Sequence, residues 1–472
     1  MAVGSHAAIR DHAAIGDGRT VALVARDGTV DWLCLPDLDS ASVFGSLLDA
    51  RAGGSFTLAP DPPFRATQRY VDGTNVLTTT FTTALGTVRV TDAMTLPDVG
   101  LAPGRELVRR IEPLAGRVPM RWAVRPRFGY GLARTDLGVR DGVPVASAGD
   151  AAIAIRAWDV GEPLVAGSSI GGAFVAEGDG LIALASAHGE PLVLPGRDDV
   201  ERRLASTADF WRGWSSATTY GGRWRDAVER SVLALKLLVF SPSGAVAGAA
   251  TTSLPETIGG ERNWDYRFSW VRDAAFTLAA LLRLGHAAEA EAYFWWLMHA
   301  SQLSHPRLDV LYRLDGGRGT AERTLPLEGY ASSRPVRVGN AAVHQLQLDV
   351  YGDLLETAWT YASVGRGLDR EIGRRLARIA DLVCAIWRWP DAGIWEVRSE
   401  PRHFTHSKMM CWVALDRAVR LADAGLLDGD VGRWARERAA IAAFVDSRCW
   451  SDAKRSYTRA AGSEELDAAV LL

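Results

Sequence analysis

The chain has 472 residues, 48% of them hydrophobic, which is enough for two or three domains with separate cores. Lys and Arg total 53 and Asp and Glu total 56, and the net charge of −3 gives no electrostatic argument for binding nucleic acid or an anionic membrane. Residues 1–20 contain no apolar segment typical of a secretory signal. The four cysteines match no metal-ligand or redox spacing, so we expect reduced thiols in a cytoplasmic protein that needs no metal or cofactor: Cys34, Cys384, Cys411 and Cys449.

Residues 1 to about 205 show the patterns of β structure. Thr87–Thr91 alternates apolar and polar side chains, as a half-buried strand does. Val76–Thr83 is rich in β-forming residues, and Ala84–Gly86 can turn it back onto that strand as a hairpin. Further short apolar runs lie between clusters of Gly, Pro and Asp, which predicts an antiparallel β-sandwich.

After about residue 205 the apolar period becomes helical. Trp224, Val228 and Val232 recur at four-residue steps, which places them on one face of a helix. The same pattern predicts helices near 222–240, 270–284, 287–302, 341–364, 369–388, 405–424 and 430–447, with an eighth beginning at Leu466. The longer loops hold most of the Gly, Pro, Trp and Arg, and long loops on a rigid scaffold are where functional sites usually lie.

Two of these loops carry candidate sugar-binding arginines. In Asn263–Asp273, the guanidinium of Arg272 and the carboxylate of Asp273 together can hold vicinal sugar hydroxyls, although a solvated ion pair in a helix's first turn is an equally good interpretation. In Glu328–Asn340, Arg334 and Arg337 can line a polyol site. Hydrogen bonds to loop carbonyls are the favoured alternative for these two arginines.

A third loop, Trp389–Arg398, carries a candidate general acid. A Pro-Asp-x-Gly turn leads into a short extended piece in which Glu396 follows Trp395. A carboxyl against an indole loses solvation, which raises its pKa and keeps it protonated, as a general acid for a glycosidic oxygen requires. Taken alone, such a dipeptide more often holds an exposed glutamate. His403 and His406 follow, but no third ligand has a recognisable spacing, so we expect polar roles rather than a metal site.

Three blocks of the sequence resemble glycoside hydrolase family 15, in its bacterial trehalase-like and glucoamylase-like form: Thr251–Asp273, Leu327–Tyr351 and Gly393–Arg417. The run from Ile15 to Pro36 resembles the sandwich domain that precedes the barrel in those enzymes. The resemblance implies a β-sandwich over residues 1–205, a linker helix over 206–222 and an (α/α)6-barrel catalytic domain over 223–472. It also implies hydrolysis of a terminal α-glucosidic bond with inversion, with trehalose or a short α-glucan as the substrate.

The resemblance assigns roles to individual residues. Glu396 corresponds to the general acid, within its Trp-Glu context. The side chains that correspond to sugar-binding residues are Tyr266, Trp270, Arg272, Asp273, Arg334, Arg337 and Trp395. Where fungal relatives have a second carboxyl directly after the acid, this chain has Val397, so binding beyond the first glucose must differ.

Inverting hydrolysis also needs a second carboxyl, about 6.5–9.5 Å from the first, to activate water. In the family this base lies in a late loop, and no segment after Glu396 resembles that loop. With about seven helices where the full barrel has twelve, we expect a barrel whose C-terminal part is missing. The alternative function is therefore an inactive remnant that at most binds carbohydrate. The expected partner is a small carbohydrate, and the oligomeric state stays open.

Overall fold

The computed structural model describes residues 6–97, 104–363, 365 and 367–472, which form two compact units. The first comprises Met1–Pro242, Ala249–Arg267 and Thr324–Val338, and the second comprises Ser243–Gly248, Phe268–Arg323 and Gly339–Leu472. Both units are discontinuous because two loop segments, 249–267 and 324–338, pack with the first unit. The predicted domain limits of 1–205, 206–222 and 223–472 stay a prediction.

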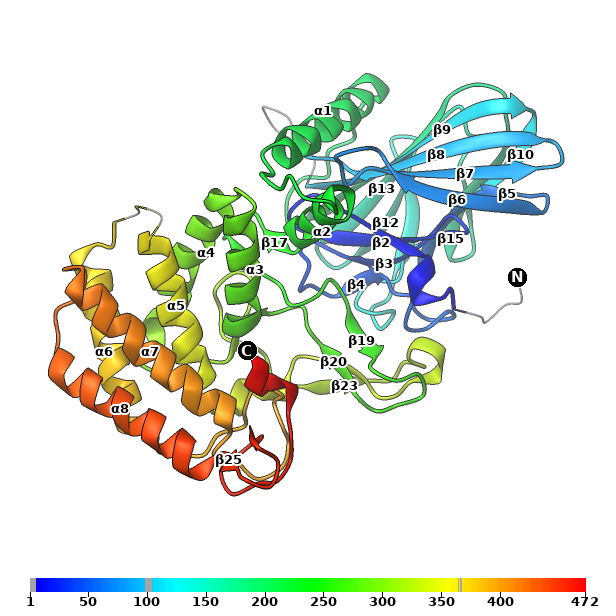
Figure 1. Ribbon diagram of the computed structural model, residues 1–472. Helices are drawn as coiled ribbons and strands as arrows, with labels where there is room; N and C mark the ends of the chain where they lie inside the picture. The colour runs from blue at the N-terminus through cyan, green and yellow to red at the C-terminus, as the bar shows by residue number, and fades with distance from the viewer. Residues whose placement is uncertain (1–5, 98–103, 364, 366) are drawn as a thin grey trace. The chain divides into compact units, whose positions relative to one another are not determined.

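The first unit contains two eight-stranded antiparallel sheets. One sheet has the order β1 (His12–Gly16), β2 (Val21–Ala25), β3 (Thr29–Cys34), β5 (Ser55–Pro60), β10 (Val118–Arg125), β15 (Ser169–Ala176) and β14 (Leu164–Ala166), with β4 (Ser42–Phe44) paired to β3. The other has the order β11 (Asp136–Arg140), β12 (Val143–Ala148), β13 (Ala151–Trp158), β16 (Gly180–His188), β9 (Arg105–Gly116), β8 (Gly86–Met94), β7 (Leu77–Thr83) and β6 (Phe64–Tyr70). Figure 1 shows these strands in blue and cyan.

The hairpin expected near residue 85 is present, with Thr83 opposite Gly86 in the β7–β8 register. Alternate side chains of both sheets point inward and form one apolar core. Trp122 is fully enclosed there, and its indole nitrogen donates to the carbonyl of Val160 at 2.9 Å. Arg109 and Asp92, both 0% exposed, form a two-point ion pair at 2.8 and 3.2 Å. A buried polar group is tolerated in such a core because it is paired.

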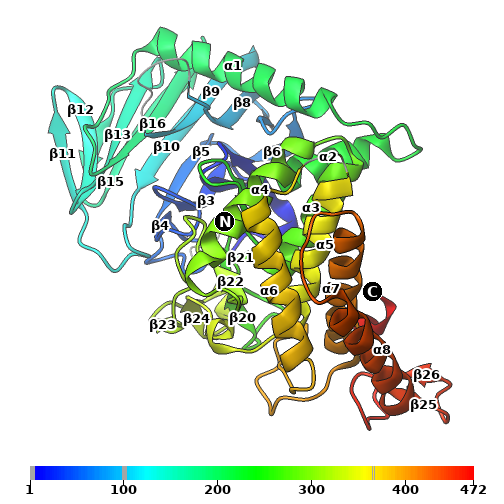
Figure 2. The same cartoon turned by 90° about the vertical axis from the view of Figure 1, so that its left-hand side faces the viewer.

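Two helices, α1 (Arg197–Ser216) and α2 (Arg225–Leu237), also belong to the first unit. Figure 2 shows α1 running along the sheet that contains β8, β9 and β16. Arg203 of α1 is ion-paired to Glu106 of β9 at 2.7 Å, and Thr207 accepts the backbone N–H of Leu96 at 2.8 Å. The helix therefore begins nine residues before the expected linker helix and is held to the sheet by buried polar contacts.

The described residues of the second unit form six α-helices: α3 (Val271–Arg283), α4 (Ala287–Ala300), α5 (Asp349–Ser363), α6 (Arg370–Ile386), α7 (Thr405–Asp423) and α8 (Val431–Arg448). Helix α5 packs between α3 and α7, while α4 contacts α3 and α5, and α6 and α8 contact α7. Figure 1 shows them side by side. Consecutive helices thus alternate between an inner row and an outer row, and the loops that join α3, α5 and α7 to preceding segments meet at one end.

The prediction of a helix over 341–364 is wrong for the first third of that range. Asn340 does cap a helix, accepting the N–H of Ala342, but this is a short 3-10 turn, Ala341–His344. The chain then runs extended before α5 begins at Asp349, because Leu348 donates its N–H to Asp391 instead of continuing a helix. The helix expected at Leu466 is likewise only a 3-10 turn, Ala468–Leu471. No helix in the described part of the chain is long and apolar enough to span a membrane.

Candidate active site

Glu396 lies in a tight turn and not in the expected extended piece. Its N–H donates to the carbonyl of Gly393 at 3.0 Å, and that of Val397 donates to the carbonyl of Ala392 at 3.2 Å. The backbone of Glu396 is left-handed, with φ of 52°, which costs a residue with a Cβ roughly 1–2 kcal/mol. Gly393 is required in the same turn, since a Cβ there would lie 2.6 Å from the ring of Phe404.

The carboxyl of Glu396 is held by residues that begin α3. Its Oε1 accepts a hydrogen bond from Trp270 Nε1 at 2.7 Å, and Arg272 Nη2 lies 3.5 Å from the same oxygen. The side chain is 18% exposed, and this burial raises the pKa of Glu396 although Arg272 and the Trp270 hydrogen bond act in the opposite direction. The expected raised pKa is therefore present, but the indole on the carboxyl belongs to Trp270 and not to Trp395.

Arg272 connects this carboxyl to Asp273. Its Nη1 donates to the carbonyl of Ile394 at 2.9 Å, and its Nη2 lies 3.0 Å from Asp273 Oδ2. The Arg272 side chain is 14% exposed and that of Asp273 is 47% exposed, so the pair presents its acidic member to solvent. Both residues stand in the first turn of α3, where the helix N-terminus favours the carboxylate.

Two further acids act on the same guanidinium from α5. Asp349 and Asp353 lie one turn apart and are 0% and 5% exposed. Burial raises the pKa of both, and Arg272 opposes this increase. His406 Nδ1 is 3.9 Å from Asp349 Oδ2, and burial lowers the pKa of His406 to about 4, so this histidine is neutral at physiological pH. Among the described residues, no three His, Cys, Asp or Glu side chains converge as a metal site requires.

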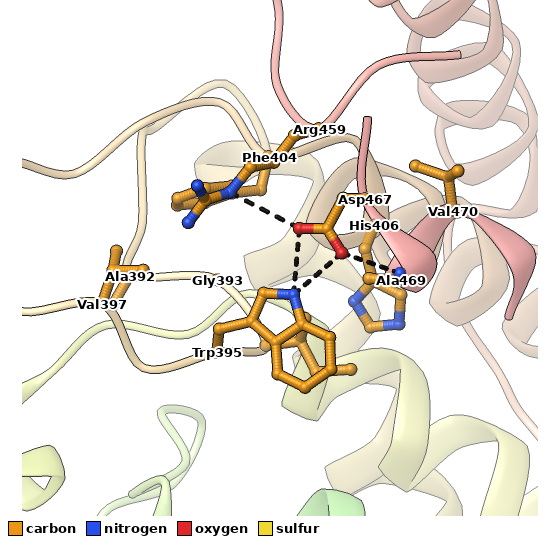
Figure 3. A pocket seen from close by; sticks show the side chains of 11 residues that line it. Ala392, Gly393, Trp395, Val397, Phe404, His406, Arg459, Asp467, Ala469 and Val470 are labelled. Atoms are coloured by element: carbon orange, nitrogen blue, oxygen red, sulfur yellow. Dashed lines mark hydrogen bonds and ion pairs between the residues drawn. The ribbon is translucent and has the colours of Figure 1, made fainter. Parts of the chain in front are cut away.

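The indole of Trp395 contacts an acid near the end of the chain. Trp395 is 56% exposed, and its Nε1 lies 2.9 Å from both carboxylate oxygens of Asp467. Figure 3 shows this pair beside Arg459, whose Nε is 3.4 Å from the same carboxylate. The sugar-binding role expected for Trp395 stays a prediction, and the present contact of its indole is with Asp467.

The remaining candidates, Tyr266, Arg334 and Arg337, belong to the first unit. Tyr266 is 38% exposed. Arg337 Nη1 donates to the carbonyl of Glu261 at 2.7 Å, and Arg334 Nε donates to that of Glu328 at 3.1 Å. These contacts agree with the alternative in which both arginines bond loop carbonyls, and their roles as sugar ligands stay predictions.

The charges of the Asn263–Asp273 segment therefore divide into two groups. Arg267, 2% exposed, is ion-paired to Asp265 at 2.8 Å and donates to the hydroxyl of Tyr130 at 2.7 Å, inside the first unit. Arg272 and Asp273 instead surround the candidate acid in the second unit. The sequence shows four charges close together but not that two of them are structural.

A family model described as glycosyl hydrolases family 15 matches residues 222–472, and one described as trehalase-like, N-terminal, matches residues 2–163. The chain belongs to glycosyl hydrolase family 15. The trehalase of Thermoplasma volcanium is 33% identical over 478 residues, an alignment that spans 100% of this chain and 76% of that protein. The trehalase of Mycobacterium tuberculosis is 34% identical over 502 residues, with 98% and 72% covered.

A bacterial glucoamylase solved in complex with acarbose shares the fold of this family 15 chain. It aligns with a TM-score of 0.68 at 11% identity, over 98% of this chain and 72% of the glucoamylase. The expected fold class, an antiparallel β-sandwich followed by part of an α/α barrel, is thereby confirmed.

Sequence analysis missed the polar residues that support Glu396 from other segments. Lys408 is 0% exposed, and its Nζ donates to the carbonyls of Trp387 at 2.6 Å and Trp389 at 2.5 Å, where the acid's loop begins. Gln345 and Gln347 contact the turn itself. The signal for the glutamines was the alternation of polar and apolar residues from Gln345 to Asp349, which indicates an extended segment.

Proposed function

We propose that this family 15 protein hydrolyses a terminal α-glucosidic bond with inversion. Trehalose is the favoured substrate, and a short α-glucan is the alternative. The observation that carries the proposal is the buried carboxyl of Glu396, held by Trp270 Nε1 and lying beside the Arg272–Asp273 pair. Trehalose is favoured because trehalases 33–34% identical align with nearly the whole chain.

In this mechanism Glu396 gives its proton to the glycosidic oxygen as the bond from that oxygen to the anomeric carbon breaks. A water attacks the anomeric carbon from the opposite face, and a base accepts the proton that the water loses. Arg272 and Asp273 bind hydroxyls of the terminal glucose. The raised pKa of Glu396 keeps the acid protonated, so the rate falls as the pH rises through that pKa.

A second candidate function is carbohydrate binding without turnover. It is favoured by the state of the acids around Arg272: among the described residues that share this guanidinium with Glu396, Asp349 and Asp353 are buried, and Asp273 is paired with Arg272. None of the three is a free, exposed carboxylate, which a general base needs.

The test is to titrate the purified 472-residue protein with trehalose and maltose by calorimetry and to follow both sugars by proton NMR. Under the proposal, trehalose binds and β-glucose is the first new anomer of the hydrolysed residue. The leaving glucose of trehalose keeps its α configuration, so inversion releases α- and β-glucose in equal amounts. Initial release of α-glucose alone would contradict inversion, and turnover of maltose alone would make the α-glucan the substrate. Binding without turnover would support the second candidate, and failure to bind either sugar would refute both.

A further inference from the structure

The extended segment Gln345–Leu348 runs beside the turn that carries Glu396. Leu346 accepts the N–H of Ala392 at 3.0 Å, and Leu348 donates its N–H to Asp391 Oδ2 at 3.0 Å. Each of these contacts joins the segment to residues that immediately precede the turn. The segment and the acid's loop therefore lie beside each other in a fixed register. This brings the side chains of Gln345 and Gln347 to the acid.

Gln345 holds the main chain of the acid. Its amide Nε2 lies 3.2 Å from the carbonyl oxygen of Glu396 and 3.3 Å from that of Val397. One carbonyl belongs to the left-handed residue and the other to the residue after it, so the amide restrains the part of the turn in which the backbone is least favourable.

Gln347 joins Gln345 to the carboxyl of the same residue. It is 1% exposed, and its Nε2 donates to Gln345 Oε1 at 3.0 Å. The same side chain lies close enough to the Glu396 carboxyl to act against the rise of its pKa. Gln347 and Gln345 thus connect the side-chain carboxyl of Glu396 to the main-chain carbonyl of the same residue.

We propose that Gln345 and Gln347 are positioning residues for Glu396, with Gln345 fixing its main chain and Gln347 fixing its carboxyl. The catalytic consequence of this inference rests on the proposed hydrolysis. Neutral amides suit the task because they orient the carboxyl without adding a charge to a crowded site. The charged and titratable groups that surround it are Arg272 and Asp273 from α3, Asp349 and Asp353 from α5, His406 from α7, and Asp391 from the same loop.

The test needs a reporter that works without turnover, and Trp270 supplies it. Because Trp270 Nε1 donates to Glu396 Oε1 at 2.7 Å, the indole proton shift in tryptophan-labelled protein should follow the ionisation of that carboxyl. Loss of one resonance in Trp270→Phe assigns the signal, and loss of its titration in Glu396→Gln assigns the titrating group.

Gln347→Leu should move the midpoint of this titration to higher pH by about half a unit or more, because a polar amide that favours the ionised carboxyl is removed. Gln345→Met should speed amide exchange in residues 393–397 about tenfold, because the turn loses its restraint on the carbonyls. Gln302→Met, at an exposed glutamine of the same unit, is the matched control and should change neither quantity. Gln345→Met, at a half-buried position, supplies the exchange test even if Gln347→Leu does not fold.

The activity arm compares trehalose with α-glucosyl fluoride, whose leaving group departs without protonation. Misdirecting the acid should lower turnover of trehalose by about 10- to 100-fold more than turnover of the fluoride. If the wild-type chain turns over neither compound, the proposed function fails, while the titration and exchange measurements still decide the positioning roles. A wild-type midpoint in Gln347→Leu together with wild-type exchange in Gln345→Met would overturn the inference.

Discussion

Replacing Glu396 by Gln should stabilise the folded protein at neutral pH while it removes the proposed acid. The side chain is 18% exposed, and burial raises the pKa of Glu396 above its ordinary value of 4.5. The folded protein therefore holds this proton more tightly than the unfolded chain does. The stability that the group contributes is complete below pH 4.5 and is lost as the pH rises through the raised pKa.

The size of the effect follows from the same linkage. Between 4.5 and the folded-state pKa, each pH unit costs the wild type up to about 1.4 kcal/mol, and glutamine does not titrate. The amide oxygen introduced by Glu396→Gln can still accept from Trp270 Nε1, so little hydrogen bonding is lost. The variant should match the wild type near pH 4 and exceed its free energy of unfolding by an amount that grows as the pH rises through the folded-state pKa.

Urea unfolding followed by tryptophan fluorescence at several pH values measures this difference. Glu400→Gln is the control, since Glu400 is exposed on the same loop and its replacement should leave stability unchanged at every pH. A Glu396→Gln protein that is less stable than the wild type at pH 7, or a difference that does not vary with pH, would refute the reasoning. The same variant should lose about 10²- to 10⁴-fold in the turnover of trehalose.

Two other substitutions test the ion pairs. Asp273→Asn should weaken binding of the terminal glucose about 10- to 100-fold by calorimetry, because a charge-assisted acceptor beside Arg272 is lost; unchanged affinity would return the pair to a structural role. Arg109→Met in the first unit should lower the free energy of unfolding by about 3–5 kcal/mol in urea, because Asp92 would remain charged and buried without its two-point partner. A loss below about 1 kcal/mol would mean that Asp92 finds another partner or takes up a proton.

Much of the fold could be predicted because its signals are local. The β7–β8 hairpin follows from alternation on both sides of a short turn, and the helices of the second unit follow from apolar residues at three- and four-residue steps. The partner of the acid could not be found in this way. Trp270 and Glu396 are 126 residues apart, and only the packing of α3 against the acid's loop brings the indole to the carboxyl. The neighbouring Trp395 was the nearer candidate in sequence, but its indole nitrogen contacts Asp467.

In the segment before α5, a helical pattern of apolar residues overlaps a strand-like alternation of polar and apolar residues. Val343, Leu346, Val350 and Leu354 fit one face of a helix, and this pattern predicted a continuous helix from 341. From Gln345 to Asp349, however, polar and apolar residues alternate with period two, and the helix begins only at the last of these residues. The helical pattern failed because the backbone N–H of Leu348 and the side chains of both glutamines are committed to the acid's loop. Tertiary contacts decided the conformation.

Burying titratable side chains around Glu396 lowers the stability of the folded protein, and no single pH removes this cost for all of them. Buried Asp349 has a raised pKa, so its contribution to stability is lost as the pH rises above 3.8. Buried His406 has a lowered pKa, so its contribution is lost as the pH falls from 6.5 toward about 4. Lowering the pH therefore relieves the burial cost of Asp349 but not that of His406, and raising the pH does the reverse. An arrangement of this kind must be held by packing and by further hydrogen bonds. Lys408 from α7 and Gln345 from the segment before α5 provide them, because they bind carbonyls at the start of the loop and in the turn itself. The direction of the acid is thus set by elements outside its own loop, as a catalytic group on a strained turn requires.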